Sequence, residues 1–296
     1  MTTTINICHP HLFSWAESLW YLNRGFDDCI YKISGNTVRR AFDVEGEKIL
    51  TEISCTDGTL MINWLTGKPS DRTEAYISSF VGVWFDLDTD LTPFYKLLAG
   101  HPAVADMTAS YHGLRLVAMP DLFETLSWAI IGQQINLTFA YKLKRRLVEQ
   151  YGSTLTFEGQ TYHIFPKPGA LKNASVVDLR ELQLSGSKAS YLVNIAESFA
   201  DNRLSREILL ALPDFPPRQK YLTDIKGIGI WTANYVLMKN LGERACIPYG
   251  DAGLLNALVA RNIIADKRDK AGLDAFFELF KGWEAYMVFY LWRSLA

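Results

Sequence analysis

The chain is organised around the stretch Ile225-Lys-Gly-Ile-Gly-Ile-Trp-Thr-Ala-Asn234, which sets two glycines in a short corner between two apolar runs. Both runs are compatible with helices, and the second helix is predicted to open at about Ile230. Glycine adopts positive φ and lets another backbone approach closely, so amides at this corner can point outward together. The free amides at a helix N-terminus attract anions. The stretch therefore predicts two helices joined by a corner that suits a phosphate of a nucleic-acid duplex.

A single carboxylate, that of Asp251, follows this corner and precedes a new apolar run. It stands at the mouth of a helix predicted over 252–259, where Asp commonly serves as the N-cap. Trp231 and Tyr235 share one face of the preceding helix, and such pairs are usually part of a core. Each feature alone has a structural explanation. The joint spacing of the corner, the aromatic face and the carboxylate is what indicates a functional site.

Length and composition indicate a globular protein with room for two or three small domains. With 296 residues, of which 49% are hydrophobic, the chain can bury substantial cores. No apolar run approaches the roughly 18 residues of a membrane helix, and the N-terminus lacks a signal-peptide pattern. The four cysteines lie far apart, so neither a zinc site nor a disulfide framework is indicated. We expect no membrane association and a cytoplasmic location of the bacterial, nucleoid-associated type, or a nuclear one in a eukaryote.

Charge is distributed unevenly along the chain. Residues 1–110 hold 8 Lys+Arg against 14 Asp+Glu, a balance of −6, whereas residues 111–296 hold 22 against 18, a balance of +4. The net charge of −2 is a poor electrostatic match for nucleic acid when the whole chain is considered. Contacts with phosphate groups are therefore expected in the second part of the chain.

Residues 1–110 are predicted to form an α/β domain. Short β-type runs separated by the turn pairs 35–36, 45–46 and 57–58 predict an antiparallel meander. A short strand is expected over 5–8, and helices over 11–22 and 71–83, the second covering one sheet face. The acids of 86–90 are interpreted as the N-terminus of a helix over 93–98, because they lack the spacing of a calcium loop. We see no catalytic set in this part.

Residues 111–296 are predicted to be helical to their end. Asp121 and Glu124 form a start similar to a capping box for a helix over 123–131. The following Gly132-Gln-Gln-Ile-Asn136 is expected to break the helix, with Asn136 as the next N-cap. The basic residues of 142–146 are interpreted as a solvated face. An irregular stretch or small hairpin is expected over 158–168, and further helices over 176–182, 188–200, 254–261, 273–280 and 283–292.

The hairpin corner (residues 225–229) and the downstream Asp251 resemble the helix–hairpin–helix DNA glycosylases, most closely the 3-methyladenine-DNA glycosylase II type. Residues 132–136 and 184–192 are similar to further elements of that family. The resemblance implies an α+β fold: an N-terminal antiparallel sheet with helices over 1–110, followed by an all-α helix–hairpin–helix (HhH-GPD) glycosylase region over 111–296. That region would consist of two helical subdomains with a cleft between them.

The resemblance also implies the site residues. Asp251 would be the catalytic carboxylate, which stabilises an oxocarbenium-like sugar and orients or deprotonates the attacking water. The base pocket would contain Trp231, Tyr235 and Trp283. The DNA-binding residues would be Gln133, Gln134 and Ile135, whose side chains fill the gap left by an extruded base, together with Lys226, Gly227, Ile228 and Gly229 at the hairpin corner. Glu284 stands where relatives often have Arg, so a phosphate contact is not expected there.

The implied activity is that of a monofunctional DNA glycosylase that flips and excises alkylated purines, 3-methyladenine and 7-methylguanine, in base excision repair. Cationic bases stack well on electron-rich rings and need little acid assistance to leave, so neutral 8-oxoguanine is expected to be a poor substrate. The expected partner is double-stranded DNA with alkylated bases, and the protein is expected to be a monomer. We expect no metal or other cofactor, and the resemblance leaves open a monovalent cation on the hairpin carbonyls.

Two other classes of protein stay open from the residues alone. A bifunctional oxidised-purine glycosylase/lyase needs a Lys shortly after the second hairpin glycine as a Schiff-base nucleophile, and Trp231 occupies that place. A non-catalytic helix–hairpin–helix DNA-binding module needs only the hairpin, and neither Asp251 nor the aromatic residues. The iron–sulfur cluster of other relatives needs four clustered cysteines, whereas Cys246 is the only cysteine after residue 55.

Overall fold

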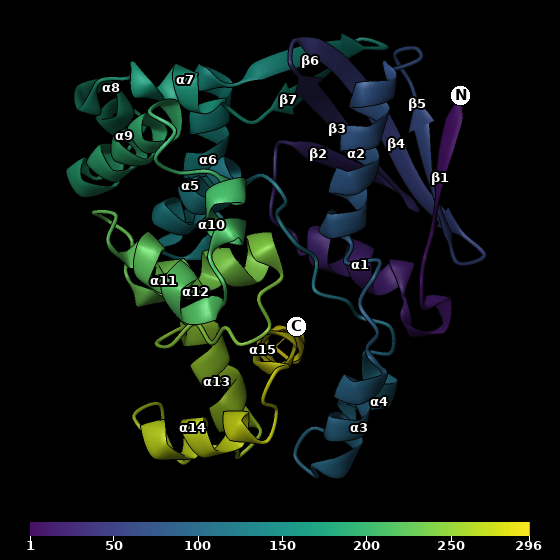
Figure 1. The fold of residues 1–296 in the computed structure, drawn as a ribbon, viewed down its shortest axis with the longest axis vertical. Coiled ribbons are helices and arrows are strands. Elements are labelled where there is room, and N and C mark those ends of the chain that lie inside the picture. The colour runs from purple at the N-terminus through teal and green to yellow at the C-terminus, as the bar shows by residue number, and fades with distance from the viewer. Residues whose placement is uncertain (296) are drawn as a thin grey trace.

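The computed structural model describes residues 1–295 and begins with a five-stranded antiparallel sheet (Figure 1). The strand order is β1-β5-β4-β3-β2, so the predicted meander is confirmed. The strands are β1 Thr2–Asn6, β2 Tyr31–Ser34, β3 Thr37–Val44, β4 Glu47–Thr56 and β5 Thr59–Trp64. Positive φ at Gly35, Gly46 and Gly58 permits the three tight reversals. β1 begins and ends earlier than the predicted 5–8, in a register that sets Ile5 opposite Leu60 of β5.

The N-terminal part also contains two helices, α1 (Trp15–Leu22) and α2 (Asp71–Trp84), and each begins after an N-cap serine. α2 covers one sheet face, where the rings of Phe80 and Phe42 meet edge to face at 5.1 Å. α1 begins later than predicted because the hydroxyl of Ser14 accepts the Glu17 amide at 3.2 Å. A single 3₁₀ turn, Pro10–Leu12, covers the first residues of the predicted helix, and Phe13 after it is extended.

The acidic segment 86–90 differs from the prediction. Asp86 adopts φ of 52° and is half-buried, and its carboxylate accepts hydrogen bonds from the hydroxyls of Thr89 and Tyr286. Burial raises the pKa of Asp86 to about 6. Only Asp90 serves the helix that follows, by accepting the Thr92 amide at 2.9 Å. Asp86 thus ties the N-terminal part to the last helix and does not interact with a helix N-terminus.

The rest of the chain is helical except for one hairpin, as the fold class predicted. The helices are α3 Thr92–Gly100, α4 Met107–Ser110, α5 Leu122–Gly132, α6 Leu137–Tyr151, α7 Pro168–Lys172, α8 Val176–Glu181, α9 Gly186–Ala200, α10 Arg206–Ala211, α11 Phe215–Thr223, α12 Ile230–Val236 with the π-turn η2 Leu237–Leu241, α13 Ala252–Ala260, α14 Lys270–Glu278 and α15 Glu284–Arg293. The predicted break after α5 is confirmed, because Asn136 caps α6 by accepting the Phe139 amide at 2.9 Å.

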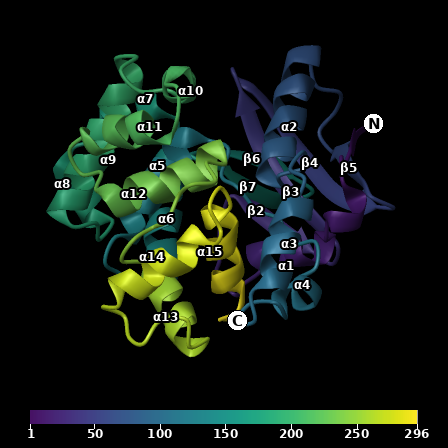
Figure 2. The ribbon, with the colours of Figure 1, turned by 60° about the horizontal axis from the view of Figure 1, so that its bottom comes forward.

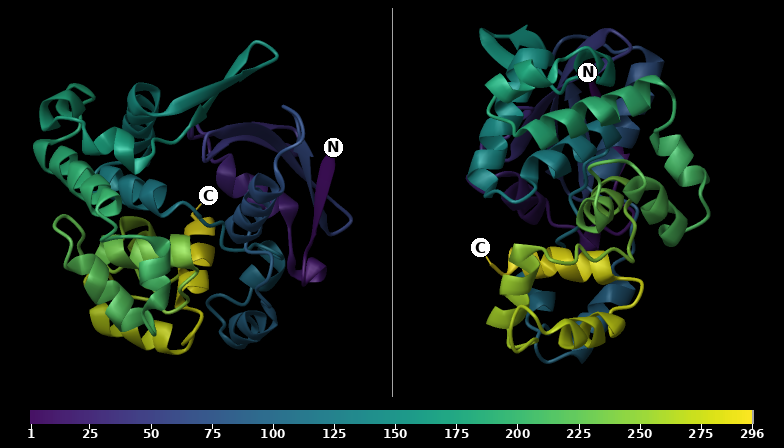
Figure 3. Two further views of the ribbon diagram at one scale, coloured as in Figure 1. Left: turned by 45° about the horizontal axis from the view of Figure 1, so that its top comes forward. Right: turned by 90° about the vertical axis from the view of Figure 1, so that its left-hand side faces the viewer.

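The hairpin of β6 (Ser153–Phe157) and β7 (Gln160–Ile164) joins the two parts of the chain. It reaches from the helical region toward the N-terminal sheet (Figure 3, left). Tyr162 packs with Ala41 and Leu50 of the sheet, and the Lys48 ammonium donates to the Thr154 carbonyl at 3.1 Å. The hairpin is longer than the predicted stretch over 158–168 and begins before it.

A second contact between the parts lies at the other end of the molecule. Figure 2 shows α15 between α12 and α14 on one side and α1 on the other. Phe94 of α3 packs on the ring of Tyr290 in α15 at 5.0 Å, and Arg293 pairs with Glu17 of α1 at 2.7 Å. The domain boundary at residue 110 stays a prediction, and extensive packing crosses it. Within residues 1–295, none of the helices combines the length and the apolar composition that a membrane crossing requires.

Candidate active site

A cavity of about 820 Å³ lies where the N-terminal part meets the helical region. α1 and the loop after it, β2, β3 and α2 line it from the N-terminal part, together with the segment 117–119. α5, α6, α12, α13 and α15 line it from the helical region. The aromatic residues of the lining are Trp20, Tyr21, Phe26, Tyr31, Trp84, Trp128, Tyr141, Trp231, Tyr235 and Trp292. A cavity with this lining suits a flat, largely apolar ring with a few polar groups.

Asp251 caps α13 and also lines this cavity. Its Oδ1 accepts the Leu254 amide at 2.7 Å and the Trp292 indole N–H at 2.9 Å. Its Oδ2 accepts a single, longer hydrogen bond, 3.4 Å, from the Trp231 indole among the described residues. Asp251 can therefore serve both as the N-cap of α13 and as a site residue, because Oδ1 caps the helix. Oδ2 is the oxygen left for a ligand.

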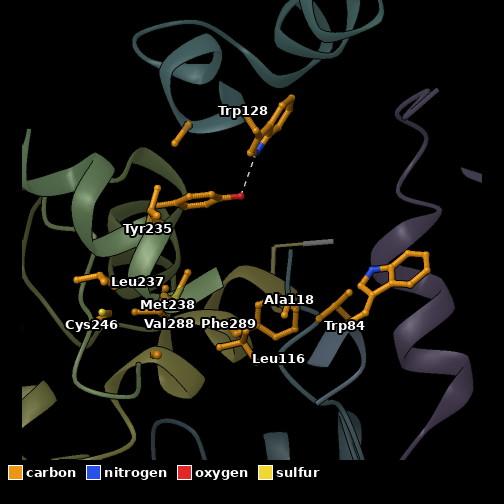
Figure 4. Close-up of a cluster of buried hydrophobic side chains, with 14 of the residues drawn as sticks. Trp84, Leu116, Ala118, Trp128, Tyr235, Leu237, Met238, Cys246, Val288 and Phe289 are labelled. Carbon is orange, nitrogen blue, oxygen red and sulfur yellow. Dashed lines mark hydrogen bonds between the residues drawn. The ribbon is translucent and has the colours of Figure 1, made fainter. Parts of the chain in front are cut away.

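Trp231 and Tyr235 both line the cavity from α12. Their rings stack with centroids 5.4 Å apart and an interplanar angle of 19°. The Tyr235 hydroxyl accepts the indole N–H of Trp128 at 3.0 Å, which joins α12 to α5 across the cavity wall (Figure 4). This hydrogen bond fixes the ring of Tyr235, and with it the aromatic face of α12 that the sequence predicts.

Trp283 lies elsewhere, which corrects its predicted place in the base pocket. It is absent from the cavity lining, and its ring stacks on Phe94 of α3 at 5.7 Å and 27°. The guanidinium of Arg244 lies 4.4 Å from the same ring. Trp292, at the other end of α15, is the tryptophan that faces Asp251. The helical pattern of residues 283–292 alone does not distinguish the two ends.

The hairpin corner places its glycines in different conformations. Gly227 has φ of 99°, and a Cβ there would lie 2.3 Å from the Tyr191 ring, so both backbone and packing require glycine. Gly229 has φ of −87°, and a Cβ there would enter open space. Only the first glycine therefore has the positive φ that was predicted, and the second is not required by the fold.

Ile228 and Lys226 flank these positions with opposite exposure. The side chain of Ile228 is buried, and its amide donates to the Ile225 carbonyl at 3.1 Å. Neither its side chain nor its amide is therefore available to DNA, which corrects the prediction for this residue. Lys226 is exposed, and its carbonyl accepts from Asn194 at 3.2 Å.

The three residues of the break after α5 also differ in role. Gln133 donates to the Gly227 carbonyl at 3.1 Å and to the Thr232 hydroxyl at 3.0 Å, so it ties the break to the hairpin corner. Gln134 is exposed with φ of 57°. Ile135 is half-buried and lines the cavity. The break and the hairpin corner therefore form one continuous edge beside the cavity.

An ion network in the cavity lining was not predicted. Glu124 pairs with Arg40 at 2.9 Å and with Lys144 at 3.0 Å, and Lys144 pairs with Asp28 at 2.9 Å. Burial alone would raise the pKa of Glu124, but the charges of Lys144 and Arg40 outweigh it and lower that pKa. The capping-box interpretation is half right, because Asp121 accepts the Glu124 amide at 2.8 Å while the Glu124 carboxylate turns to this network.

The burial of Lys144 contradicts the prediction that the basic residues of α6 form a solvated face. Its side chain is 1% exposed. The sequence held a signal, since Lys144 shares a face with Ala140 and Leu147, both buried. Within the part of the chain that the structure describes, no three His, Cys, Asp or Glu side chains gather in a way that could hold a metal ion.

Comparisons with known proteins agree with this geometry. Residues 127–281 match the family described as HhH-GPD superfamily base excision DNA repair protein, and residues 17–126 match the N-terminal domain of 8-oxoguanine DNA glycosylase. A DNA-3-methyladenine glycosylase of Bacillus subtilis is 35% identical, over 98% of this chain and 97% of its own. DNA-3-methyladenine glycosylase 2 of Escherichia coli is 27% identical, over 65% of this chain and 64% of its own.

A solved structure resembles the whole chain. The 3-methyladenine DNA-glycosylase from Archaeoglobus fulgidus superposes with a TM-score of 0.84, covers 98% of this chain and 97% of its own, and shares 23% identity, so this likeness is one of fold. Together, the sequence matches and the fold define the class: a DNA N-glycosylase of base excision repair. The chain belongs to the HhH-GPD superfamily, which confirms the predicted family. A non-catalytic DNA-binding module is thereby excluded.

Proposed function

We propose that the protein is a monofunctional glycosylase that releases alkylated purines, 3-methyladenine and 7-methylguanine, from double-stranded DNA. The observation that carries this proposal is the Asp251 carboxylate on the wall of an aromatic cavity, with Trp231 where a lyase needs Lys. The name of the Bacillus subtilis relative, DNA-3-methyladenine glycosylase, supports the same substrate class.

Catalysis then proceeds by water attack on an extruded nucleotide. A base inside the duplex is out of reach, so it leaves the stack and enters the cavity. As the glycosidic bond breaks, positive charge develops on the sugar, and the Asp251 carboxylate stabilises it and orients the attacking water. Trp292 and the Leu254 amide hold Oδ1, which keeps Oδ2 in a fixed position.

The stacked pair of Trp231 and Tyr235 favours a cationic base. An alkylated purine carries positive charge, and a desolvated cation over an aromatic face gains about 1–2 kcal/mol. The two rings already lie within 19° of parallel, and Trp128 holds Tyr235 while Asp251 accepts the Trp231 indole N–H, so little side-chain entropy is lost when a base stacks on them. The same aromatic face is expected to accept several alkylated purines, because stacking depends on the shape and charge of the base and little on its polar atoms.

We assign DNA contacts to the edge formed by the hairpin corner and the break after α5. The exposed Lys226 and the backbone at Gly227 and Gly229 are proposed to hold one phosphate without reading sequence. Gln134 and Ile135 are proposed to fill the gap left by the extruded base. A monovalent cation on the hairpin carbonyls stays a prediction, as does the monomeric state.

The two hairpin glycines provide a matched pair of variants. Gly229→Ala is expected to keep the wild-type melting temperature, because its Cβ meets open space, and to weaken binding of all duplexes about equally. Gly227→Ala is expected to destabilise the fold by about 1–3 kcal/mol through the Tyr191 ring and the positive φ. Thermal unfolding and fluorescence anisotropy with two unrelated duplexes test both. Loss of affinity for one sequence alone would contradict the phosphate assignment.

A covalent intermediate is not expected. With Trp231 in the position of the lyase nucleophile, attack comes from water and the abasic strand stays intact. Borohydride reduction during turnover on a methylated duplex is expected to trap no protein–DNA adduct. Stoichiometric trapping would establish the oxidised-purine glycosylase/lyase alternative, in which an amine attacks the sugar.

Competition between lesions on one duplex tests the proposed substrate class. We expect release of both 3-methyladenine and 7-methylguanine, and release of neutral 8-oxoguanine that is slower by about fivefold to thirtyfold, which corresponds to a difference of roughly 1–2 kcal/mol in stacking. Single-turnover rates for each lesion in the same sequence context supply the comparison. A clear preference for 8-oxoguanine would refute the assignment to alkylated purines.

A further inference from the structure

The N-terminal part contributes two charged side chains to the cavity lining that the mechanism above does not use. The guanidinium of Arg40, on β3, lies 2.9 Å from a carboxylate oxygen of Glu124 on α5. The carboxylate of Asp28, in the loop before β2, lies 2.9 Å from the ammonium of Lys144 on α6. Lys144 also pairs with Glu124 at 3.0 Å, so the four side chains form one line of ion pairs that joins the two parts of the chain.

Stability alone does not account for this ion network. The side chains of Glu124 and Lys144 are 4% and 1% exposed, so both charges have lost their hydration. Apolar side chains of similar volume stabilise a core as well as such pairs do, or better. Burial alone would lower the pKa of Lys144, but the charges of Asp28 and Glu124 outweigh it and raise that pKa, so the ammonium stays charged. Charged pairs hold only when donor and acceptor face each other, so the network restricts how α5 and α6 lie against the N-terminal part.

The indole of Trp128 lies directly against the network. Trp128 follows Glu124 by one turn of α5, so the two side chains share a face of that helix. The Lys144 ammonium lies 5.7 Å from the centroid of the Trp128 ring. Tyr141 of α6 packs on the same ring with centroids 4.5 Å apart, and Phe26, from the loop before β2, stacks on Tyr141 at 5.1 Å and 10°. Groups from both parts of the chain thus confine this indole.

Trp128 connects the network to the aromatic face of α12. Its indole N–H donates to the Tyr235 hydroxyl at 3.0 Å (Figure 4), and the Tyr235 ring stacks on that of Trp231. An indole has a single N–H, so a change in its position or orientation breaks this hydrogen bond. The position of the stacked rings therefore depends on how the N-terminal part holds α5 and α6.

We propose that Arg40 and Asp28 are positioning residues: through Glu124 and Lys144 they hold Trp128, and with it the aromatic face of α12, in the position that base release requires. The inference rests on the proposed glycosylase function and gives the N-terminal part a role in it. None of the four residues of the network belongs to the edge assigned to DNA contacts. A break in the network should therefore slow base release and leave DNA affinity unchanged.

Two variants break the network at its ends. Arg40→Met and Asp28→Asn each remove one outer partner and leave Glu124 and Lys144 paired with each other. Each variant is expected to slow single-turnover release of 7-methylguanine by about tenfold to a hundredfold, the effect of a small misplacement in a reacting site. Affinity for a duplex with an abasic-site analogue, which places no base in the cavity, is expected to change less than about twofold, because phosphate contacts supply it. With folded enzyme in saturating excess, partial unfolding does not change the rate constant.

The indole N–H of Trp128 tests the proposed connection in the absence of any reaction. Trp128→Phe identifies its signal among those of the eight tryptophans in a ¹⁵N-correlated NMR spectrum. In Arg40→Met and in Asp28→Asn, this proton is expected to exchange with water at least about tenfold faster, because local opening of the hydrogen bond to Tyr235 becomes more frequent. A network that only stabilised the fold would not act on this one indole.

Arg39→Met is the matched control. Arg39 is the neighbour of Arg40 on β3 and also pairs with a glutamate, Glu52 at 2.7 Å, but it lies outside the cavity lining. This variant is expected to keep the wild-type release rate and the wild-type exchange of the Trp128 indole proton. Slower release with unchanged Trp128 exchange would overturn the inference, as would wild-type behaviour of both network variants. A wild-type protein that releases no 7-methylguanine would refute the proposed function, and the exchange rates would still decide whether the N-terminal part holds Trp128.

Discussion

The Asp251→Asn variant is expected to lose at least about a hundredfold in the rate of base release while it folds and binds DNA normally. The loss follows from removing the one charge placed to stabilise the oxocarbenium-like sugar. Folding is preserved because Asn is as good an N-cap as Asp, and the amide oxygen can accept from Leu254 and Trp292 as Oδ1 does. Single-turnover release of 7-methylguanine, with the melting temperature and the DNA affinity, measures the three properties separately.

Asp269→Asn is the matched control for this variant. Asp269 caps α14 through the same kind of bond, in which its Oδ1 accepts the Gly272 amide at 2.8 Å, but it lies outside the cavity lining. The control is expected to keep the wild-type rate. If the folded Asp251→Asn protein released bases at a rate near that of the wild type, Asp251 would be only a cap.

The Lys144→Met variant is expected to have the largest effect on stability, a loss of about 3–5 kcal/mol in the free energy of unfolding. The substitution leaves the buried carboxylates of Glu124 and Asp28 without their shared cation. Lys142→Met, an exposed neighbour on the same helix, is expected to change the free energy of unfolding by less than about 0.5 kcal/mol. Urea unfolding at pH 7 compares the variants. Equal stability of the two would show that the ion network contributes nothing.

The pH dependence of this loss has a defined sign. Because the folded-state pKa of Glu124 is lowered, its ion pairs stabilise the protein above its unfolded pKa, roughly 4.3. This stabilisation is lost as the pH falls through the folded-state pKa. The difference in stability between wild type and Lys144→Met should therefore shrink on acidification. A difference that grew below pH 4 would contradict the role of Glu124.

Local signals in the sequence predicted much of the fold and part of the site. The hairpin corner, the caps at Asn136 and Asp251 and the tight turns of the sheet depend on a few neighbouring residues, and the structure contains each of them. Stacking of Trp231 on Tyr235 follows from helical spacing in the same way.

The remaining features depend on contacts between distant parts of the chain. Trp283 is the N-cap residue of α15 and Trp292 lies near the end of that helix, and their neighbours in sequence do not show that Trp283 packs on Phe94 while Trp292 faces Asp251. Lys144 is buried because Asp28, from the N-terminal part, lies beside it. The contribution of Arg40 and Asp28 to the cavity was missed for the same reason, since no catalytic pattern exists within residues 1–110 themselves.

The most direct measurement of the central claim is chromatographic identification of the bases that the protein releases from DNA methylated with dimethyl sulfate. The account predicts free 3-methyladenine and 7-methylguanine, an abasic strand that stays intact, and release that falls by at least about a hundredfold with Asp251→Asn. Absence of methylated bases from the products, or their undiminished release by the folded Asp251→Asn protein, would contradict it.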